Sequence, residues 1–307
     1  MSIERIVSFL PSATELIFEL DCQDKLYGVT HECLYPKNAK LKPRVIESVF
    51  DPEKLSSKQI DEKISELISN GEDVFRLNSK NLINANPDLI ISQEICQVCS
   101  AYTSQVNDAI NILDKKPDVF TMDPHNINEI LLTIIDISKK IGIESKGRKL
   151  VESLQTKIEY LKNKKFLHEP KIVAIEWIDP FFTAGHWIPE MIELTGAKNL
   201  ISKKGEHSRK MTINDIKNTD PDMLILMPCG FSVERTIKEY KNILENNSEW
   251  NSLRAVKNHN VFAVDANSFF SKPSFRTITG IEILGKIIQP EIFKELEVPS
   301  KSFSKIN

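Results

Sequence analysis

The chain has 307 residues, of which 41% are apolar and 27% charged, with a formal net charge of −3. This is the composition of an ordinary globular protein, and it excludes disordered and fibrous classes. The slight negative charge also argues against a nucleic-acid partner, because such binding depends on basic side chains that neutralise phosphates. The chain has no run of about 18 apolar residues, so the sequence predicts no transmembrane helix.

In the first half of the chain, short apolar runs alternate with segments of helical periodicity. The runs at residues 5–10, 25–30, 87–92 and 119–122 predict strands, and those at 13–20, 57–70 and 127–140 predict helices. Strands that alternate with helices are typical of a parallel sheet covered by helices.

A long charged segment separates this half from a second one. Residues 144–166 keep a helical apolar period without an interior proline, and about 23 residues would span roughly 34 Å. Strands are then predicted at 171–176, 222–227 and 260–265. We therefore expect an α/β fold: an N-terminal lobe at 1–142, a connecting helix at 143–166, a C-terminal lobe at 167–293 and a polar tail at 294–307.

An internal echo supports two related lobes. Residues 84–91 read NANPDLII, and 134 positions later residues 218–225 read NTDPDMLI. A shared helix-to-strand turn is one explanation, since proline stops helices well, but duplicated lobes fit better.

The unusual side chains follow the predicted strands. Ligands of open parallel sheets bind beyond the carboxyl ends of the strands, so these loops are where we expect a ligand site. The aromatic, polar and imidazole candidates there are His31, Glu32, Glu94, Trp177, His186, Trp187 and Phe231. The two tryptophans are equally well explained as core residues, while His168, His207 and His259 are expected to be solvated.

Four of the five cysteines also fall in these loops. Cys33, Cys96, Cys99 and Cys229 could serve as thiolate ligands for zinc, copper or an iron–sulfur centre. The alternative is that each is a small buried apolar residue, as we expect for Cys22.

The N-terminus predicts a compartment. Residues 6–20 do not resemble a secretory signal, because Pro11, Glu15 and Glu19 interrupt the apolar run. An odd number of cysteines also suits a reducing environment. We expect a cytoplasmic protein, or an extracytoplasmic one if export uses an unrecognised route.

Several segments together resemble a known family. Residues 5–16 (RIVSFLPSATEL), 28–30, 35–36, 86–91, 179–185 and the segment from Phe269 to Arg276 follow the order found in helical-backbone, or class III, substrate-binding proteins. These proteins serve ABC importers of vitamin B12 and iron chelates, and the chain resembles the cobalamin-binding branch most. The likeness covers roughly residues 4–290.

The resemblance implies two Rossmann-like lobes joined by a single backbone helix, with a corrinoid held in a cleft between them. Carried over by position, the ligand surface comprises Pro11, Ser12, Thr14, Glu32, Cys33, Gln93, Phe181, Phe182, Phe269 and Phe270. The resemblance also assigns permease docking to Glu15. The chain departs from the family at the second docking position, where an acidic residue is expected. It has Asn214 there, with Asp215 beside it.

Two functions remain open from the sequence. The first is a monomeric binding protein for a small-molecule ligand, namely cobalamin or a related corrinoid or metal chelate. It would work either as an intracellular carrier or as an importer component that docks to an ABC permease. The second is a cytosolic metalloprotein or thiol enzyme that uses the cysteines on the same scaffold. The absence of a nucleotide motif or of a hydrolase arrangement at recognisable spacing favours the binding protein over an enzyme.

Overall fold

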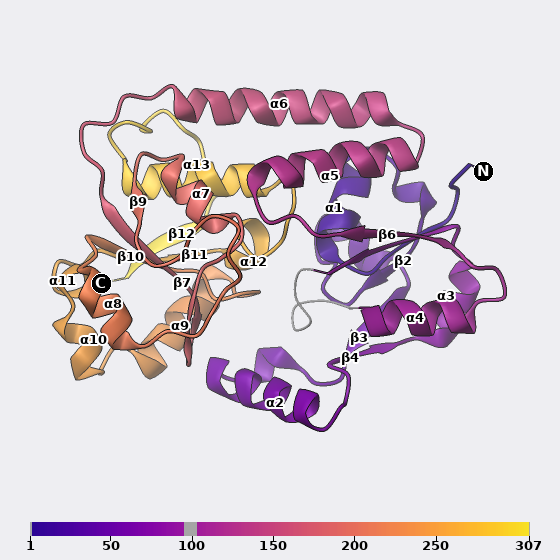
Figure 1. Cartoon of the computed structure of the whole chain (residues 1–307), viewed down its shortest axis with the longest axis horizontal. Helices are drawn as coiled ribbons and strands as arrows, with labels where there is room; N and C mark the ends of the chain where they lie inside the picture. The colour runs from indigo at the N-terminus through magenta and orange to yellow at the C-terminus, as the bar shows by residue number, and fades with distance from the viewer. Residues whose placement is uncertain (1, 95–102, 307) are drawn as a thin grey trace. The chain divides into compact units, whose positions relative to one another are not determined.

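The computed structural model describes residues 2–94 and 103–306, which form two compact α/β units (Figure 1). Unit 1 comprises Met1–Leu55, Glu62–Pro124 and Glu129–Glu152, and unit 2 comprises Ser56–Asp61, His125–Asn128 and Ser153–Asn307. The α/β fold with two lobes is confirmed. The helix α6 (Glu144–Lys162) contributes residues to both units, while the domain boundaries and the interlobe cleft stay predictions.

Unit 1 contains a six-stranded sheet in the order β4-β3-β2-β1-β5-β6. Its strands are β1 (Ile6–Ser8), β2 (Leu26–Thr30), β3 (Arg44–Ser48), β4 (Phe75–Leu77), β5 (Leu89–Gln93) and β6 (Asp118–Met122). The helices of this half of the chain are α1 (Pro11–Glu19), α2 (Ser57–Ser69), α3 (Ser79–Ala85), α4 (Thr103–Ile112) and α5 (Ile127–Lys140), with 3₁₀ turns η1 (Gln23–Lys25), η2 (Lys37–Leu41) and η3 (Pro52–Lys54).

Unit 2 contains a second sheet, in the order β12-β11-β10-β7-β8, with β9 paired to β7. Its strands are β7 (Lys171–Ile178), β8 (Phe181–Thr183), β9 (Lys198–Asn199), β10 (Met223–Leu226), β11 (Val261–Val264) and β12 (Phe303–Ile306). Its helices are α7 (Ile188–Glu193), α8 (Ile213–Thr219), α9 (Val233–Ile243), α10 (Ser248–Ser252), α11 (Arg254–Lys257), α12 (Ala266–Phe269) and α13 (Thr277–Ile288).

Helices cover both faces of the unit 2 sheet. Apolar residues of β7, β10 and β11 pack with α8, α9 and α10 around Trp250, which is fully buried. On the opposite face α7 packs against α13 (Figure 1). The approach there is close, since a Cβ on Gly280 would lie 2.7 Å from the Met191 side chain. Helix packing on both faces therefore holds the sheet in place, with the carboxyl ends of the parallel strands β7, β10 and β11 on the same side.

The sequence echo corresponds to the same local structure in both units. Asn86 ends α3 and Asp220 ends α8, each in the left-handed conformation, with φ of 40° and 43°. Asp88 then accepts a hydrogen bond from the backbone N–H of Arg5, and Asp222 accepts one from that of Lys171. These equivalent turns support the duplication.

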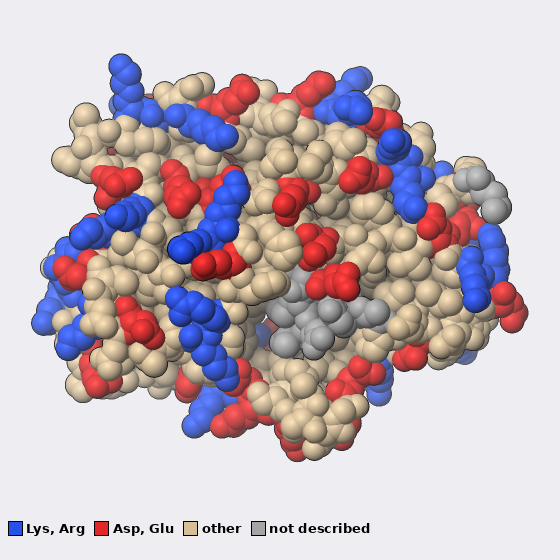
Figure 2. Space-filling model, viewed as in Figure 1, with Lys and Arg blue, Asp and Glu red and all other residues tan. Residues whose placement is uncertain are grey.

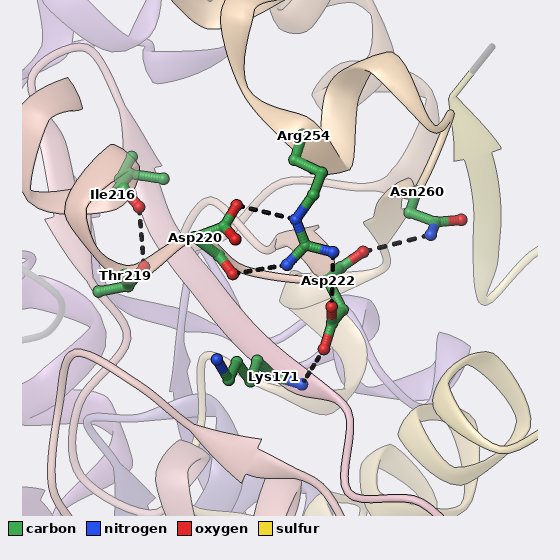
Figure 3. A network of polar contacts seen from close by, with 7 residues as sticks. All are labelled: Lys171, Ile216, Thr219, Asp220, Asp222, Arg254 and Asn260. Atoms are coloured by element: carbon green, nitrogen blue, oxygen red, sulfur yellow. Dashed lines mark hydrogen bonds and ion pairs between the residues drawn. The ribbon is translucent and has the colours of Figure 1, made fainter.

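In unit 2 the turn is held by a network around Arg254 (Figure 3). The guanidinium donates to the Asp220 carboxylate and backbone carbonyl and to the Asp222 carboxylate, all at 2.8 Å. The N–H of Lys171 and the guanidinium lower the pKa of Asp222, and the two carboxylates raise the pKa of Arg254. The network fixes the position at which β10 begins beside β7. It thereby sets the register of the two strands, and this register determines where the residues at their carboxyl ends lie.

The structure corrects two expectations about the sheets. They are mixed rather than wholly parallel, because β3–β4, β7–β8 and β11–β12 pair in antiparallel fashion. Part of the segment 294–307, expected to be a polar tail, is the edge strand β12. The edge strands of these pairs, β4, β8 and β12, are only three or four residues long and partly exposed, so they lack the apolar run that marks a buried parallel strand.

Charged side chains are interspersed on the face shown in Figure 2, where Lys and Arg lie among Asp and Glu. Within residues 2–94 and 103–306, no helix combines the length and the apolar character that a membrane span requires.

Candidate functional site

In unit 1 the loop after β1 begins α1. Pro11 occupies the first turn of this helix, where its missing N–H costs nothing. Ser12 and Thr14 are 2% and 0% exposed. The Ser12 hydroxyl has no hydrogen-bond partner among the described residues, whereas the Thr14 hydroxyl lies 3.1 Å from the Cys33 sulfur.

Cys33 is a buried, hydrogen-bonded thiol. It is 2% exposed, and its sulfur also lies 3.3 Å from the Thr30 hydroxyl and accepts from the Thr30 N–H at 3.4 Å. These contacts join the exits of β1 and β2. They give Cys33 a role in packing unit 1, in addition to any role toward a ligand.

The other expected residues of unit 1 surround these exits. His31 contacts the Phe75 ring at a centroid distance of 5.8 Å, Glu32 is partly buried, Gln93 is 7% exposed at the end of β5, and Glu94 is exposed. Glu15, to which the resemblance assigns permease docking, is only 2% exposed. This burial does not support docking, which needs an accessible carboxylate.

The cysteine cluster stays a prediction. Cys33 belongs to unit 1 and Cys229 to unit 2, while Cys96 and Cys99 lie outside the described residues. Cys22 is buried and free.

In unit 2 the expected aromatic residues fall into two groups. Trp187, Phe231, Phe269 and Phe270 are at most 7% exposed. The Trp187 indole donates to the Phe270 carbonyl at 3.0 Å, which ties the start of α7 to the end of α12. This group packs the unit and offers a ligand little surface.

The second aromatic group retains accessible surface. Trp177, Phe181 and Phe182 are partly exposed and surround the exit of β7 and the following strand β8. Phe181 stacks on the buried Trp250 at 5.8 Å, and Trp177 packs edge-on against Phe231 at 5.3 Å. The rings of Trp177 and Phe181 are therefore oriented by the core before any ligand arrives.

Three histidines of unit 2 meet, and one of them, His186, also contacts the Trp187 ring at a centroid distance of 5.6 Å. His125 precedes α5, His186 precedes α7, and His207 lies in the loop before α8. Their ring centroids are 5.1 to 5.5 Å apart, and one nitrogen from each lies within 4.8 Å of the others. Sequence reasoning proposed His186 alone and expected His207 to be solvated. His207 is exposed, but it belongs to this cluster.

A buried carboxylate holds two of the loops that carry these histidines. Glu176, on β7, accepts from the Gly185 N–H at 3.1 Å and from the Ser208 hydroxyl at 2.7 Å. Burial raises the pKa of Glu176, and these two hydrogen bonds oppose the rise. Each donor is next in sequence to a histidine of the cluster, so Glu176 positions both rings through the backbone.

Comparisons with known proteins give one family and a common fold. A family model described as periplasmic binding protein matches residues 6–268. An uncharacterised ABC transporter substrate-binding lipoprotein, YvrC of Bacillus subtilis, is 28% identical over 301 residues, which cover 95% of this chain and 82% of the relative.

Two solved structures share the fold at low identity. The vitamin B12 binding protein BtuF of Vibrio cholerae is 18% identical with a TM-score of 0.66, over 96% of this chain and 99% of its own. A periplasmic heme-binding protein of Pseudomonas aeruginosa is 13% identical with a TM-score of 0.74, over 99% and 98%.

These findings overturn the expected compartment. The matching family is described as periplasmic, and the Bacillus subtilis relative as a lipoprotein. The expectation of a cytoplasmic protein is therefore wrong. It depended on the absence of a leader pattern and on the number of cysteines, neither of which reports on the family that the rest of the chain matches.

Proposed function

The chain belongs to the periplasmic binding protein family, and on this premise we propose that it is the substrate-binding component of an ABC importer, with a corrinoid of the cobalamin type as its ligand. The importer role follows the description of the Bacillus subtilis relative. The corrinoid is the more specific step, and the V. cholerae protein is a B12 binder of the same fold.

The observation that carries the corrinoid is the accessible aromatic surface of unit 2. Trp177, Phe181 and Phe182 lie at the carboxyl end of β7, where open parallel sheets bind ligands. A large flat macrocycle buries apolar surface against aromatic rings and needs few polar anchors. Because the core already orients the rings of Trp177 and Phe181, their binding to a ligand costs little side-chain entropy.

Heme is the competing flat ligand of the same class. The P. aeruginosa structure is a heme binder of the same fold, and an imidazole such as that of His186 is a common axial ligand of heme iron. Heme is therefore an alternative outcome of the binding experiment. The second function considered from the sequence was a cytosolic metalloprotein or thiol enzyme. That hypothesis assumed a cytosolic location, which the family match contradicts.

Titration with cyanocobalamin and, separately, with hemin tests the proposal. The three tryptophans, Trp177, Trp187 and Trp250, all belong to unit 2, so their fluorescence reports directly on that unit, and visible absorption follows the ligand. We expect saturable quenching by cyanocobalamin at one molecule per chain. Saturation by hemin alone would replace the corrinoid with heme, and the absence of both would refute a tetrapyrrole ligand.

A matched pair of variants tests the aromatic surface. Phe182→Ala should weaken binding by about 1 to 3 kcal/mol, roughly 5- to 150-fold. Phe262→Ala is the matched control, because both phenylalanines lie on strands and are partly exposed. Each ring also contacts a lysine, whose Nζ lies 5.7 Å from the ring centroid of Phe182 and 5.9 Å from that of Phe262. Equal affinities for the two variants would move the ligand away from β8.

A further inference from the structure

The cluster of His125, His186 and His207 lies entirely within unit 2. The three residues come from segments far apart in sequence, and none of the three is on a helix or strand. Three imidazoles in contact need an explanation, because charged imidazoles repel one another.

The spacing of one pair of ring nitrogens matches a tetrahedral metal site, and the third histidine offers a nitrogen within 4.8 Å of that pair. The Nδ1 atoms of His125 and His186 are 3.3 Å apart. Zinc–nitrogen bonds of about 2.0 to 2.1 Å at the tetrahedral angle separate two ligand nitrogens by roughly 3.3 to 3.4 Å. A direct N–H···N hydrogen bond would usually be shorter, since heavy-atom distances to nitrogen donors are most often near 2.9 to 3.0 Å.

The backbone that presents two of these rings is unusually constrained. A Cβ on Gly185 would lie 2.5 Å from the Glu206 carbonyl and 2.6 Å from the Ser208 nitrogen. His186 itself has a φ of 53°, in the left-handed region that few residues other than Gly, Asn, Asp and His adopt. Such local strain persists only where the surroundings impose it, and it concentrates at functional sites.

The two loops are also hydrogen-bonded to each other. The His186 N–H donates to the Glu206 carbonyl at 2.6 Å, and the Gly205 N–H donates to the His186 carbonyl at 2.9 Å. Together with the contacts of Glu176, these bonds fix His186 beside His207. His125 is brought to them by the Ile127 N–H, which donates to the Glu190 carboxylate on α7 at 2.9 Å.

We propose that His125, His186 and His207 are the ligands of one divalent transition-metal ion, with Zn²⁺ as the best match. Imidazole nitrogen suits this class of ion, and alkaline-earth ions prefer oxygen. Three protein ligands leave a fourth position for water. The ion ties residues 125–128 to the loops at 185–187 and 205–208. This site is independent of the proposed corrinoid surface.

The test uses the full chain without a polyhistidine tag, stripped with a chelator and titrated with Zn²⁺ against a chromophoric competitor. We expect one ion per chain and a higher melting temperature with Zn²⁺. Co²⁺ in the same site should give the visible absorption of a tetrahedral ion. His186→Asn, which the left-handed backbone tolerates, and His207→Ala should each weaken binding by more than about 10-fold.

His168→Ala is the matched control, because His168 is exposed and outside the cluster. It should bind Zn²⁺ like the unmodified chain. If the chain binds no stoichiometric Zn²⁺, or if His207→Ala binds as tightly as the His168→Ala control, the metal site is refuted and the histidines form a hydrogen-bonded cluster only. His207 is exposed, so its variant decides the matter even if His186→Asn is unstable. Cyanocobalamin titrations of the same variants show separately whether the corrinoid proposal holds.

Discussion

Gly185→Ala should destabilise unit 2, because Gly185 packs directly against backbone. The added Cβ would meet the Glu206 carbonyl at 2.5 Å, the Ser208 nitrogen at 2.6 Å and the His207 carbonyl carbon at 2.9 Å. Overpacking of this kind costs about 1 to 3 kcal/mol. Displacing the loop also breaks the bond from the Gly185 N–H to Glu176, worth about 1 kcal/mol. We expect a total loss of about 2 to 4 kcal/mol.

Urea unfolding followed by tryptophan fluorescence measures this loss in unit 2, where all three tryptophans lie. Gly205→Ala is the control, in the neighbouring loop at 205–208, whose Gly205 N–H donates to the His186 carbonyl. Gly205 has a φ of 80° and no atom within 4 Å of an added Cβ, so only left-handed strain of about 1 kcal/mol applies. The reasoning is refuted if Gly185→Ala unfolds within about 0.5 kcal/mol of the unmodified chain, or if it loses no more than Gly205→Ala and keeps its affinity for Zn²⁺.

Two further predictions concern the scaffold. The ion pair with Lys115 and the N–H groups of Glu4 and Arg5 hold the pKa of Asp88 below its ordinary 3.8, so its contribution is complete above that pH and is lost as the pH falls through the lowered value. Asp88→Asn should cost about 1 to 3 kcal/mol of unfolding free energy at pH 7 and flatten the acid dependence below pH 4. An unchanged acid limb in urea melts would contradict this. Leu154→Pro, inside α6 and 6% exposed, should cost about 3 kcal/mol or more, whereas Glu144→Pro at the first helical position should be tolerated. Equal circular-dichroism melts of these two variants would contradict an uninterrupted helix.

The buried parallel strands and the long helices were predictable from sequence because their patterns are local. The runs at 87–92 and 171–176 are apolar enough to predict β5 and β7, and the period at 127–140 gives the bounds of α5. The antiparallel edge strands escaped prediction. Their short, half-polar sequences, such as FRL in β4 and FSKI in β12, are strands only because a neighbour pairs with them.

The candidate site was predictable only in part. The rule that ligands bind at strand exits found Trp177 and His186, because these residues follow the predicted strand at 171–176 in sequence. It could not show that Trp187 and Phe270 are buried against each other, since burial depends on the packing of α7 and α12.

His125 and His207 were missed for a related reason, because the contacts among the histidines are not local. A signal did exist at His186, which follows Gly185 in a loop and carries a positive φ in the structure. A Gly-His pair at a strand exit is consistent with close backbone approach to another loop. It gives no indication of which loop approaches, so the partner His207 could be found only from the structure.

The duplication explains why scaffold and chemistry differ in predictability. The same turn recurs in both units, with a left-handed residue before Pro-Asp and a carboxylate that accepts the N–H of the neighbouring strand. That turn lies where β5 and β10 begin, opposite the ends that carry candidate ligand residues. A repeat that fixes strand register at one end leaves the loops at the other end free to diverge. The three histidines come from segments with no counterpart in the echo. The candidate ligand residues of unit 2 therefore lie in its loops, and the repeated turn only fixes the strands that position those loops.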